Sequence, residues 1–175
     1  MIFLLPTDTC YGLAGVFNKQ DFQVIYRLKG RDFSKQLAIL VENYEDMRHY
    51  IEISDDQIEF LKSYPHPWSF LGKRNPIFVL PDFLDAQKYE FISIRVASVC
   101  LPIQPSHYPT IPPFPLFLTS ANTSGKLESK TLSEAREYFP GVEGIDGGVC
   151  DHLPSDIFSL DANGEVMYLR RNYGI

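Results

Sequence analysis

The sequence lacks any run of apolar residues that could cross a membrane, since a spanning helix needs roughly 20 of them. Residues 1–5 are apolar, but this segment is too short for the core of a signal peptide and has no basic start. We therefore expect a cytoplasmic protein with no membrane partner. The three cysteines, Cys10, Cys100 and Cys150, lie far apart and form neither a zinc pattern nor a disulfide framework, so reduced thiols are expected.

Histidine and positive charge are also scarce. The four histidines are scattered without a metal-ligand spacing, so we expect no metal site built by the protein. The net charge of −6 argues against a dedicated nucleic-acid-binding protein. Many basic residues nevertheless cluster, which is consistent with a local site for a small polyanion; scattered, solvated charges are the alternative that stays open. The clusters are Lys29/Arg31/Lys35, Lys73/Arg74, Lys126/Lys130 and Arg170/Arg171.

The glycine signatures of several well-known sites are missing. Residues 120–127 resemble a P-loop at Gly125-Lys126, but Leu127 stands where a Ser or Thr would hold magnesium. Neither the Gly-x-Ser-x-Gly turn of a hydrolase nor the dinucleotide-binding fingerprint occurs. A triphosphate site would therefore be built from side-chain cations and hydroxyls that converge from separate loops.

What the sequence does contain is a dense polar segment directly after its first apolar run. Residues 2–5 predict a buried strand, and Pro6 ends its ladder because it has no N–H to donate. Residues 7–12 then supply two hydroxyls, a carboxylate, a thiol, a phenol and a glycine. In an open α/β sheet, ligands usually bind at polar loops beyond the carboxyl ends of strands. The alternative is a turn whose Thr and Asp side chains bond to their own backbone.

The rest of the chain alternates strands with short helices. Helices are expected at residues 18–30, 43–50, 57–64 and 134–139, of which the first runs from an Asn18 cap to Gly30 and the third follows a capping box at Ser54. Strands are expected at residues 37–41, 76–80, 91–96, 116–118, 157–160 and 166–169, the last two as a hairpin through Asn163-Gly164. Prolines make segments 64–69 and 102–115 irregular.

This order of elements predicts the fold class. The expected structure is a single α/β (α+β) domain over residues 1–175, with a twisted open mixed sheet, flanking helices and a concave basic cleft. The loops would bring cations and neutral hydrogen-bonding groups together around phosphates and a carboxylate. The cations are Lys29, Arg31, Arg95, Arg170 and Arg171; the neutral groups are Ser69, Ser120, Asn122 and Ser155.

Seven segments also resemble the YrdC/YciO-like family, the threonylcarbamoyl-AMP synthases, over nearly the whole chain. The similar segments are Pro6–Leu13, Leu28–Arg31, Tyr64–Ser69, Ile94–Val96, Ser120–Gly125, Ser155–Ile157 and Leu169–Arg171. The chain departs from the family pattern at Gln36 (where the family has Pro), Leu40 (often His), His66 (Gly) and Ala97 (Pro). It also starts shortly before Pro6, without the helix that usually precedes the motif, and without the added domain of the longer members.

The resemblance implies a YrdC-like fold and one reaction. ATP, L-threonine and bicarbonate would give threonylcarbamoyl-AMP and pyrophosphate, for the threonylcarbamoyladenosine modification of tRNA through a partner transferase. Mg²⁺ would arrive with ATP. Lys29 and Arg31 would be catalytic, because preorganised cations stabilise the charge that builds on the phosphoryl oxygens. No nucleophilic side chain is needed, so Cys10 is expected to be a packed residue.

The resemblance also implies which residues hold each substrate. The ATP-binding residues would be Lys29, Arg31, Ser69, Ser120, Asn122, Ser124, Arg170 and Arg171. The threonine-binding residues would be Thr7, Thr9, Tyr11, Arg95 and Ser155, with the Arg95 guanidinium on the threonine carboxylate.

Two other functions stay open at this point. One is a YrdC-like protein that binds nucleotides or double-stranded RNA without synthase activity. The other is a carbamoyl-transfer domain of the hydrogenase-maturation type. Threonine-dependent turnover of ATP separates the synthase from both, and RNA affinity that falls steeply with salt would favour the first alternative.

Overall fold

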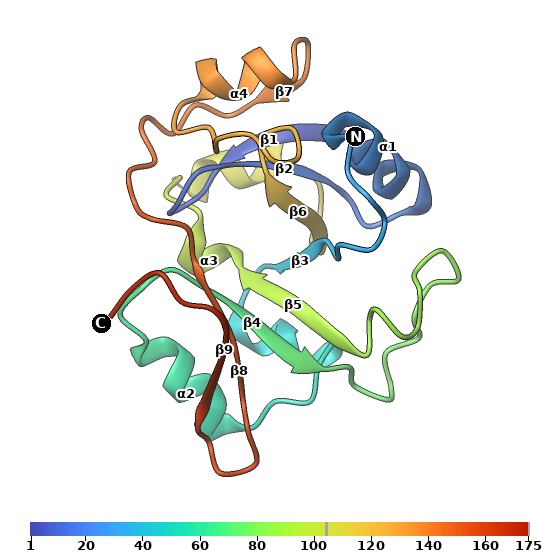
Figure 1. Cartoon of the computed structure of the whole chain (residues 1–175), viewed down its shortest axis with the longest axis vertical. Coiled ribbons are helices and arrows are strands. Elements are labelled where there is room, and N and C mark those ends of the chain that lie inside the picture. The colour runs from blue at the N-terminus through green and yellow to red at the C-terminus, as the bar shows by residue number, and fades with distance from the viewer. Residues whose placement is uncertain (104, 175) are drawn as a thin grey trace.

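The computed structural model describes residues 1–103 and 105–174, which form nine strands and a few short helices (Figure 1). The strands are β1 (Ile2–Pro6), β2 (Tyr11–Val16), β3 (Ala38–Val41), β4 (Trp68–Lys73), β5 (Phe91–Val96), β6 (Leu116–Ser120), β7 (Glu143–Gly144), β8 (Asp156–Leu160) and β9 (Val166–Arg170). The helices are α1 (Lys19–Lys29), α2 (Asp55–Ser63), α3 (Ala97–Cys100) and α4 (Leu132–Tyr138), with 3₁₀ turns η1 (Tyr44–His49) and η2 (Pro105–Thr110).

All of these strands join one twisted sheet in the order β7-β1-β2-β6-β3-β5-β4-β8-β9. The pairs β1/β7, β3/β5 and β4/β8 are parallel, and the other neighbouring pairs are antiparallel. The mixed sheet with flanking helices that the sequence predicts is therefore confirmed.

Local signals in the sequence explain the ends of the two longer helices. The Asn18 side chain accepts a hydrogen bond from the Asp21 N–H at 2.8 Å at the start of α1, and Gly30 ends this helix with φ of 58°, a left-handed conformation that suits glycine. The capping box at the start of α2 joins Ser54 and Gln57 in both directions. Both predicted helix starts are confirmed.

Three expectations are wrong. Residues 76–80 form a turn, not a strand, and the Ile77 and Val79 side chains are 75% and 86% exposed. β4 begins at Trp68, inside a segment that the prolines were expected to keep irregular. β2 begins at Tyr11 and takes in the last two residues of the polar segment 7–12, so the loop proper is residues 7–10. In addition, residues 44–49 form a 3₁₀ helix rather than an α-helix, and the proline-rich segment contains η2.

The strand registers bring polar residues from distant parts of the sequence to one region. β2 pairs with β6 so that Gly12 lies opposite Ser120, which places the β1–β2 loop beside the end of β6. A Cβ atom at Gly12 would lie 2.5 Å from Leu118 Cδ1, so a larger residue at this position would have to displace the end of the Leu118 side chain. In the other half of the sheet, Ser69 lies opposite Ile157, and Ile157 opposite Arg170.

Apolar side chains cover both faces of the sheet. The larger cluster includes Phe22 and Ile25 of α1 and Phe117 and Phe158 of the sheet, and the smaller one packs α3 against Leu40 and its neighbours. Within the described part of the chain, no helix is long and apolar enough to span a membrane.

Candidate active site

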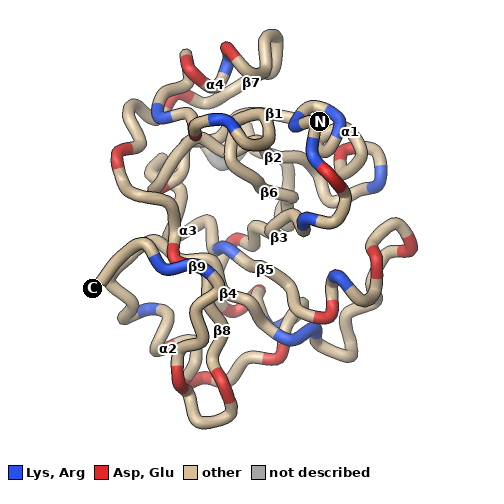
Figure 2. Tube along the Cα trace, viewed as in Figure 1, with Lys and Arg blue, Asp and Glu red and all other residues tan. Residues whose placement is uncertain are grey.

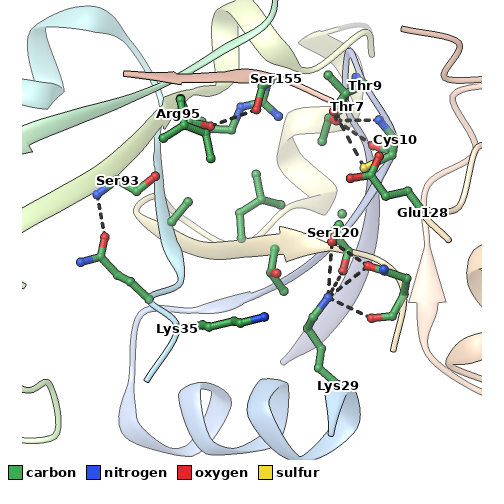
Figure 3. A pocket seen from close by; sticks show the side chains of 18 of the residues that line it. Thr7, Thr9, Cys10, Lys29, Lys35, Ser93, Arg95, Ser120, Glu128 and Ser155 are labelled. Carbon is green, nitrogen blue, oxygen red and sulfur yellow. Dashed lines mark hydrogen bonds between the residues drawn. The ribbon is translucent and has the colours of Figure 1, made fainter. Parts of the chain in front are cut away.

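A cavity of about 320 Å³ opens where the polar strand ends meet (Figure 3). Its lining comes from the β1–β2 loop, the end of α1, strands β4, β5 and β6, the loop after β6, and the ends of β8 and β9. The structure brings together here all but two of the residues predicted from the sequence. Those that line the cavity are Thr7, Thr9, Lys29, Arg31, Ser69, Arg95, Ser120, Asn122, Ser124, Ser155 and Arg170.

Tyr11 and Arg171 are the two predicted residues outside the lining. The Tyr11 ring is fully buried, and its hydroxyl donates to the Gly148 carbonyl at 3.0 Å and accepts from the Gly147 N–H at 2.9 Å. The Arg171 guanidinium lies 4.7 Å from the centre of the Tyr168 ring and donates to the Gly174 carbonyl. Neighbouring residues along an extended chain point in opposite directions, so only Arg170 of the arginine pair turns inward.

Lys29 ties the end of α1 to the loop after β6. Its Nζ donates to the Ser120 carbonyl at 2.5 Å, the Asn122 carbonyl at 2.9 Å and Asn122 Oδ1 at 3.2 Å, and the side chain is 3% exposed. Burial, and next the nearby Arg31 guanidinium, lower the pKa of Lys29 to about 8. A buried ammonium that faces a basic cavity would gain strongly from a polyanionic ligand.

We expect the affinity for ATP to fall as the pH rises through about 8. The ammonium form of Lys29, which attracts phosphate, predominates below this pKa and is lost above it. The measurement is the dissociation constant of ATP between pH 7.5 and 9.5. Lys29→Met should bind more weakly and lose most of this alkaline dependence; an unchanged pH profile in the variant would show that another group titrates.

Arg31 bridges two walls of the cavity. Its Nη1 donates to Thr119 Oγ1 at 2.9 Å and its Nη2 to the Gln36 carbonyl at 3.1 Å, whereas its buried Nε has no partner in the described residues. Gln36 in turn bonds through its side chain to the carbonyls of Lys88 and Phe91 and to the Ser93 N–H. Burial lowers the pKa of Arg31, although arginine stays charged at neutral pH.

Arg95 is held by a buried ion pair. Its Nη2 donates to Asp8 Oδ1 and its Nε donates to the Trp68 carbonyl at 3.2 Å, and the side chain is 8% exposed. Burial alone would lower the pKa of Arg95, but the negative charges of Cys100, when ionised, and Asp8 raise it above the usual range. The guanidinium therefore stays charged, and among the described residues its third nitrogen, Nη1, has no hydrogen-bond acceptor and is left for a ligand.

Arg170 and two serines form another part of the cavity wall. Arg170 Nε donates to the Ser155 carbonyl at 2.9 Å and Nη2 to Ser155 Oγ at 3.1 Å. The hydroxyls of Ser155 and Ser69 lie 3.4 Å apart. This chain of contacts fixes a cation and two hydroxyls at the edge of the cavity.

The two arginines at the end of β9 make a matched pair for mutagenesis. We expect Arg170→Met to weaken ATP binding about tenfold, since a hydrogen bond from a charged group contributes about 1.5–3 kcal/mol. Arg171→Met removes the same charge outside the cavity and should change the affinity less than twofold. The measurement is the dissociation constant of ATP for both variants. An equal loss of affinity in the two variants would contradict the assignment of Arg170 alone.

The β1–β2 loop shows that both interpretations of the polar segment apply. Thr7 Oγ1 donates to the Cys10 carbonyl at 2.6 Å and accepts from the N–H groups of Thr9 and Cys10 at 3.3 Å each, as expected of a turn bonded to its own backbone. The same turn presents Thr7 and Thr9 to the cavity. Cys10 is buried, and burial raises the pKa of its thiol to about 11, so it is a poor nucleophile.

Several polar lining residues were not predicted. They are Lys35, Gln36, Ser93, Thr119 and Glu128. Lys35 belongs to a basic cluster that the sequence did reveal, whereas Gln36, Ser93 and Glu128 match no motif. No group of three or more His, Cys, Asp or Glu side chains in the described part of the chain is placed to hold a metal ion.

A sequence model of the Sua5/YciO/YrdC family, described as "Telomere recombination", matches residues 1–172. The chain belongs to this family. It is 29% identical over 160 residues to the threonylcarbamoyl-AMP synthase of Pseudoalteromonas atlantica, covering 85% of this chain and 79% of the relative. It is 28% identical over 151 residues to that of Mus musculus, covering 84% of this chain and 51% of the relative.

Solved structures of the Sua5/YciO/YrdC family share the fold. The solution structure of MTH1692 from Methanobacterium thermoautotrophicum has a TM-score of 0.69 at 30% identity, covering 99% of this chain and 81% of that protein. The P. abyssi Sua5 structure complexed with L-threonine has a TM-score of 0.70 at 21% identity. The match covers 91% of this chain and 47% of that Sua5 chain, so this protein spans about half its length.

Proposed function

We propose that this protein is a threonylcarbamoyl-AMP synthase that uses ATP, L-threonine and bicarbonate. The observation that supports this most directly is the composition of the cavity, where Lys29, Arg31 and Arg170 face the same space as a buried Arg95. A triphosphate and an amino-acid carboxylate are both anions, and the cations that line this cavity come from separate elements. Figure 2 marks the lysines and arginines along the chain trace. Relatives bearing this enzyme name at 28–29% identity support the same reaction.

The geometry supports a division of the cavity between the two substrates. Lys29 and Arg31 lie beside the Ser120–Asn122 turn, and we assign the phosphates to this end. Arg95 lies beside the β1–β2 loop through its ion pair with Asp8, and we assign the threonine carboxylate to its free Nη1. Thr7 and Thr9 would then provide hydroxyls near the amino acid.

The proposed reaction has two steps. The threonine amine, after losing a proton, attacks bicarbonate to give a carbamate and water. A carbamate oxygen then attacks the α-phosphorus of ATP, the bond to the β-phosphate oxygen breaks, and pyrophosphate leaves. Lys29 and Arg31 stabilise the charge that develops on the phosphoryl oxygens, and the fixed walls hold three reactants in order. Mg²⁺ would enter with ATP, and the product would pass to a partner transferase that modifies tRNA.

The test is the release of pyrophosphate from ATP and Mg²⁺ with bicarbonate. L-threonine should stimulate release strongly, L-serine weakly, and omission of the amino acid should leave only background. Mass spectrometry should find threonylcarbamoyl-AMP in the threonine reaction. If ATP binds but threonine stimulates no release, the synthase proposal is wrong, and a nucleotide-binding or double-stranded-RNA-binding role takes its place; steeply salt-dependent binding of an RNA duplex would identify the latter.

A further inference from the structure

Glu128 is the single carboxylate side chain among the described residues that line the cavity. The other charged side chains of this lining are all cations. The cations are Lys29, Arg31, Lys35, Arg95 and Arg170. Asp8, which pairs with Arg95, lies outside this lining. A carboxylate in such a position weakens the binding of any purely anionic ligand. Glu128 therefore needs a positively charged partner, either in the protein or in the ligand.

The described parts of the protein, residues 1–103 and 105–174, offer Glu128 one long ion pair and no hydrogen bond. That ion pair joins the Glu128 carboxylate to Lys130 Nζ at 4.0 Å. Lys130 Nζ already donates to the Thr9 carbonyl at 2.7 Å and to the His152 carbonyl at 2.8 Å. The Glu128 side chain is 26% exposed, so its oxygens remain available to a ligand in the cavity.

The carboxylate points toward the amino-acid end of the cavity. Figure 3 shows the Glu128 side chain directed at the loop that carries Thr7, Thr9 and Cys10. The negative charge of Glu128 also acts on the Cys10 thiol. Burial is the largest cause that raises the pKa of this thiol, and Glu128 is the second largest. Glu128 and Arg95 therefore approach the same loop with opposite charges.

We propose that Glu128 binds the α-ammonium group of the amino-acid substrate while Arg95 binds its carboxylate. An ammonium group that enters a cavity with several fixed cations is repelled unless an anion compensates, and this lining offers one. The pair of charges would select an α-amino acid over a hydroxy acid of the same shape. This inference rests on the proposed synthase function, because it concerns the second substrate of that reaction.

The experiment compares two ligands that differ only at the α-position. L-threonine and (2S,3R)-2,3-dihydroxybutanoate share a carboxylate and a β-hydroxyl, but the second has a hydroxyl in place of the ammonium. Calorimetry should show that the wild-type protein binds threonine about tenfold or more tightly than the hydroxy acid, the size expected of a charge-assisted hydrogen bond. Glu128→Gln should lose this preference while binding the hydroxy acid within twofold of wild type.

Glu137→Gln is the matched control, because Glu137 is an exposed carboxylate on α4 and does not line the cavity. It should keep the wild-type preference. Equal weakening of both ligands in Glu128→Gln would assign Glu128 a structural role, and an unchanged preference would exclude the contact; either result overturns the inference. A loss of Mg²⁺-ATP affinity alone would make Glu128 a metal ligand instead. If the wild-type protein binds no threonine at all, the proposed function itself fails.

Discussion

Lys29→Met should reduce threonine-dependent release of pyrophosphate by roughly 10²–10³-fold, the usual cost of removing a preorganised group that stabilises a developing negative charge. The wild-type ammonium is held within 2.5–3.4 Å of oxygen atoms of Ser120 and Asn122 and is almost completely buried. Methionine has a similar length and no charge, so it fills the space but supplies neither donors nor attraction for phosphate. The measurement is the initial rate at saturating ATP and threonine.

The loss must be separated from damage to the fold, because Lys29 also anchors the loop after β6. Lys19→Met is the control, since Lys19 is an exposed lysine at the opposite end of α1. It should retain wild-type activity. Thermal unfolding of both variants reports stability, and Lys29→Arg should recover part of the activity if charge is what matters. A Lys29→Met protein that keeps more than a third of the wild-type rate would contradict the catalytic assignment.

Arg95→Met should abolish detectable threonine binding and also lower the free energy of unfolding by about 2 kcal/mol, less than the usual cost of breaking a fully buried ion pair because the Asp8 side chain is 20% exposed. The first effect follows from losing the proposed partner of the threonine carboxylate. The second follows because Asp8 would keep a partly buried negative charge without its guanidinium. Calorimetric titration with threonine measures the first effect, and urea unfolding at pH 7 measures the second.

Asp8→Asn separates the two roles of Arg95. It breaks the same ion pair and should destabilise the fold comparably, yet it keeps the guanidinium, so threonine should still bind within about tenfold of wild type. Arg136→Met, which removes an exposed arginine of α4, should change neither quantity. If Arg95→Met binds threonine normally, the carboxylate site lies elsewhere in the cavity.

Much of the fold could be predicted because its signals are local. The alternating segment 91–96 coincides with β5, and the Asn-Gly turn joins β8 to β9 as expected. The sequence did not predict β2, because its two glycines and its polar neighbours are not typical of a buried strand. The close approach of Gly12 to Leu118 on the neighbouring strand is a contact that no local pattern contains.

The strand expected at residues 76–80 is wrong for the opposite reason: the local pattern is present, but the fold does not use it as a strand. Its apolar residues look buried in sequence, but the segment forms an exposed turn because β4 and β5 pair with each other across it. In the cavity, the predicted motif residues are present except Tyr11 and Arg171, whereas Gln36, Ser93 and Glu128 were not predicted as site residues. Their place depends on how separate loops pack, and glutamine, serine and glutamate at these positions carry no pattern of their own.

The cavity draws its walls from both ends of the sequence, with Thr7 near the start and Arg170 at the end of β9. A protein emerging from the ribosome folds from its amino terminus, and contacts between distant segments must wait for the later one. A nascent chain that has reached the loop after β6 can therefore hold Lys29 in place through Ser120 and Asn122 and still lack the wall formed by Ser155 and Arg170. Full affinity for a nucleotide at this cavity would thus require a chain whose synthesis has passed β9, and fragments cut before that strand should bind ATP more weakly than the whole chain.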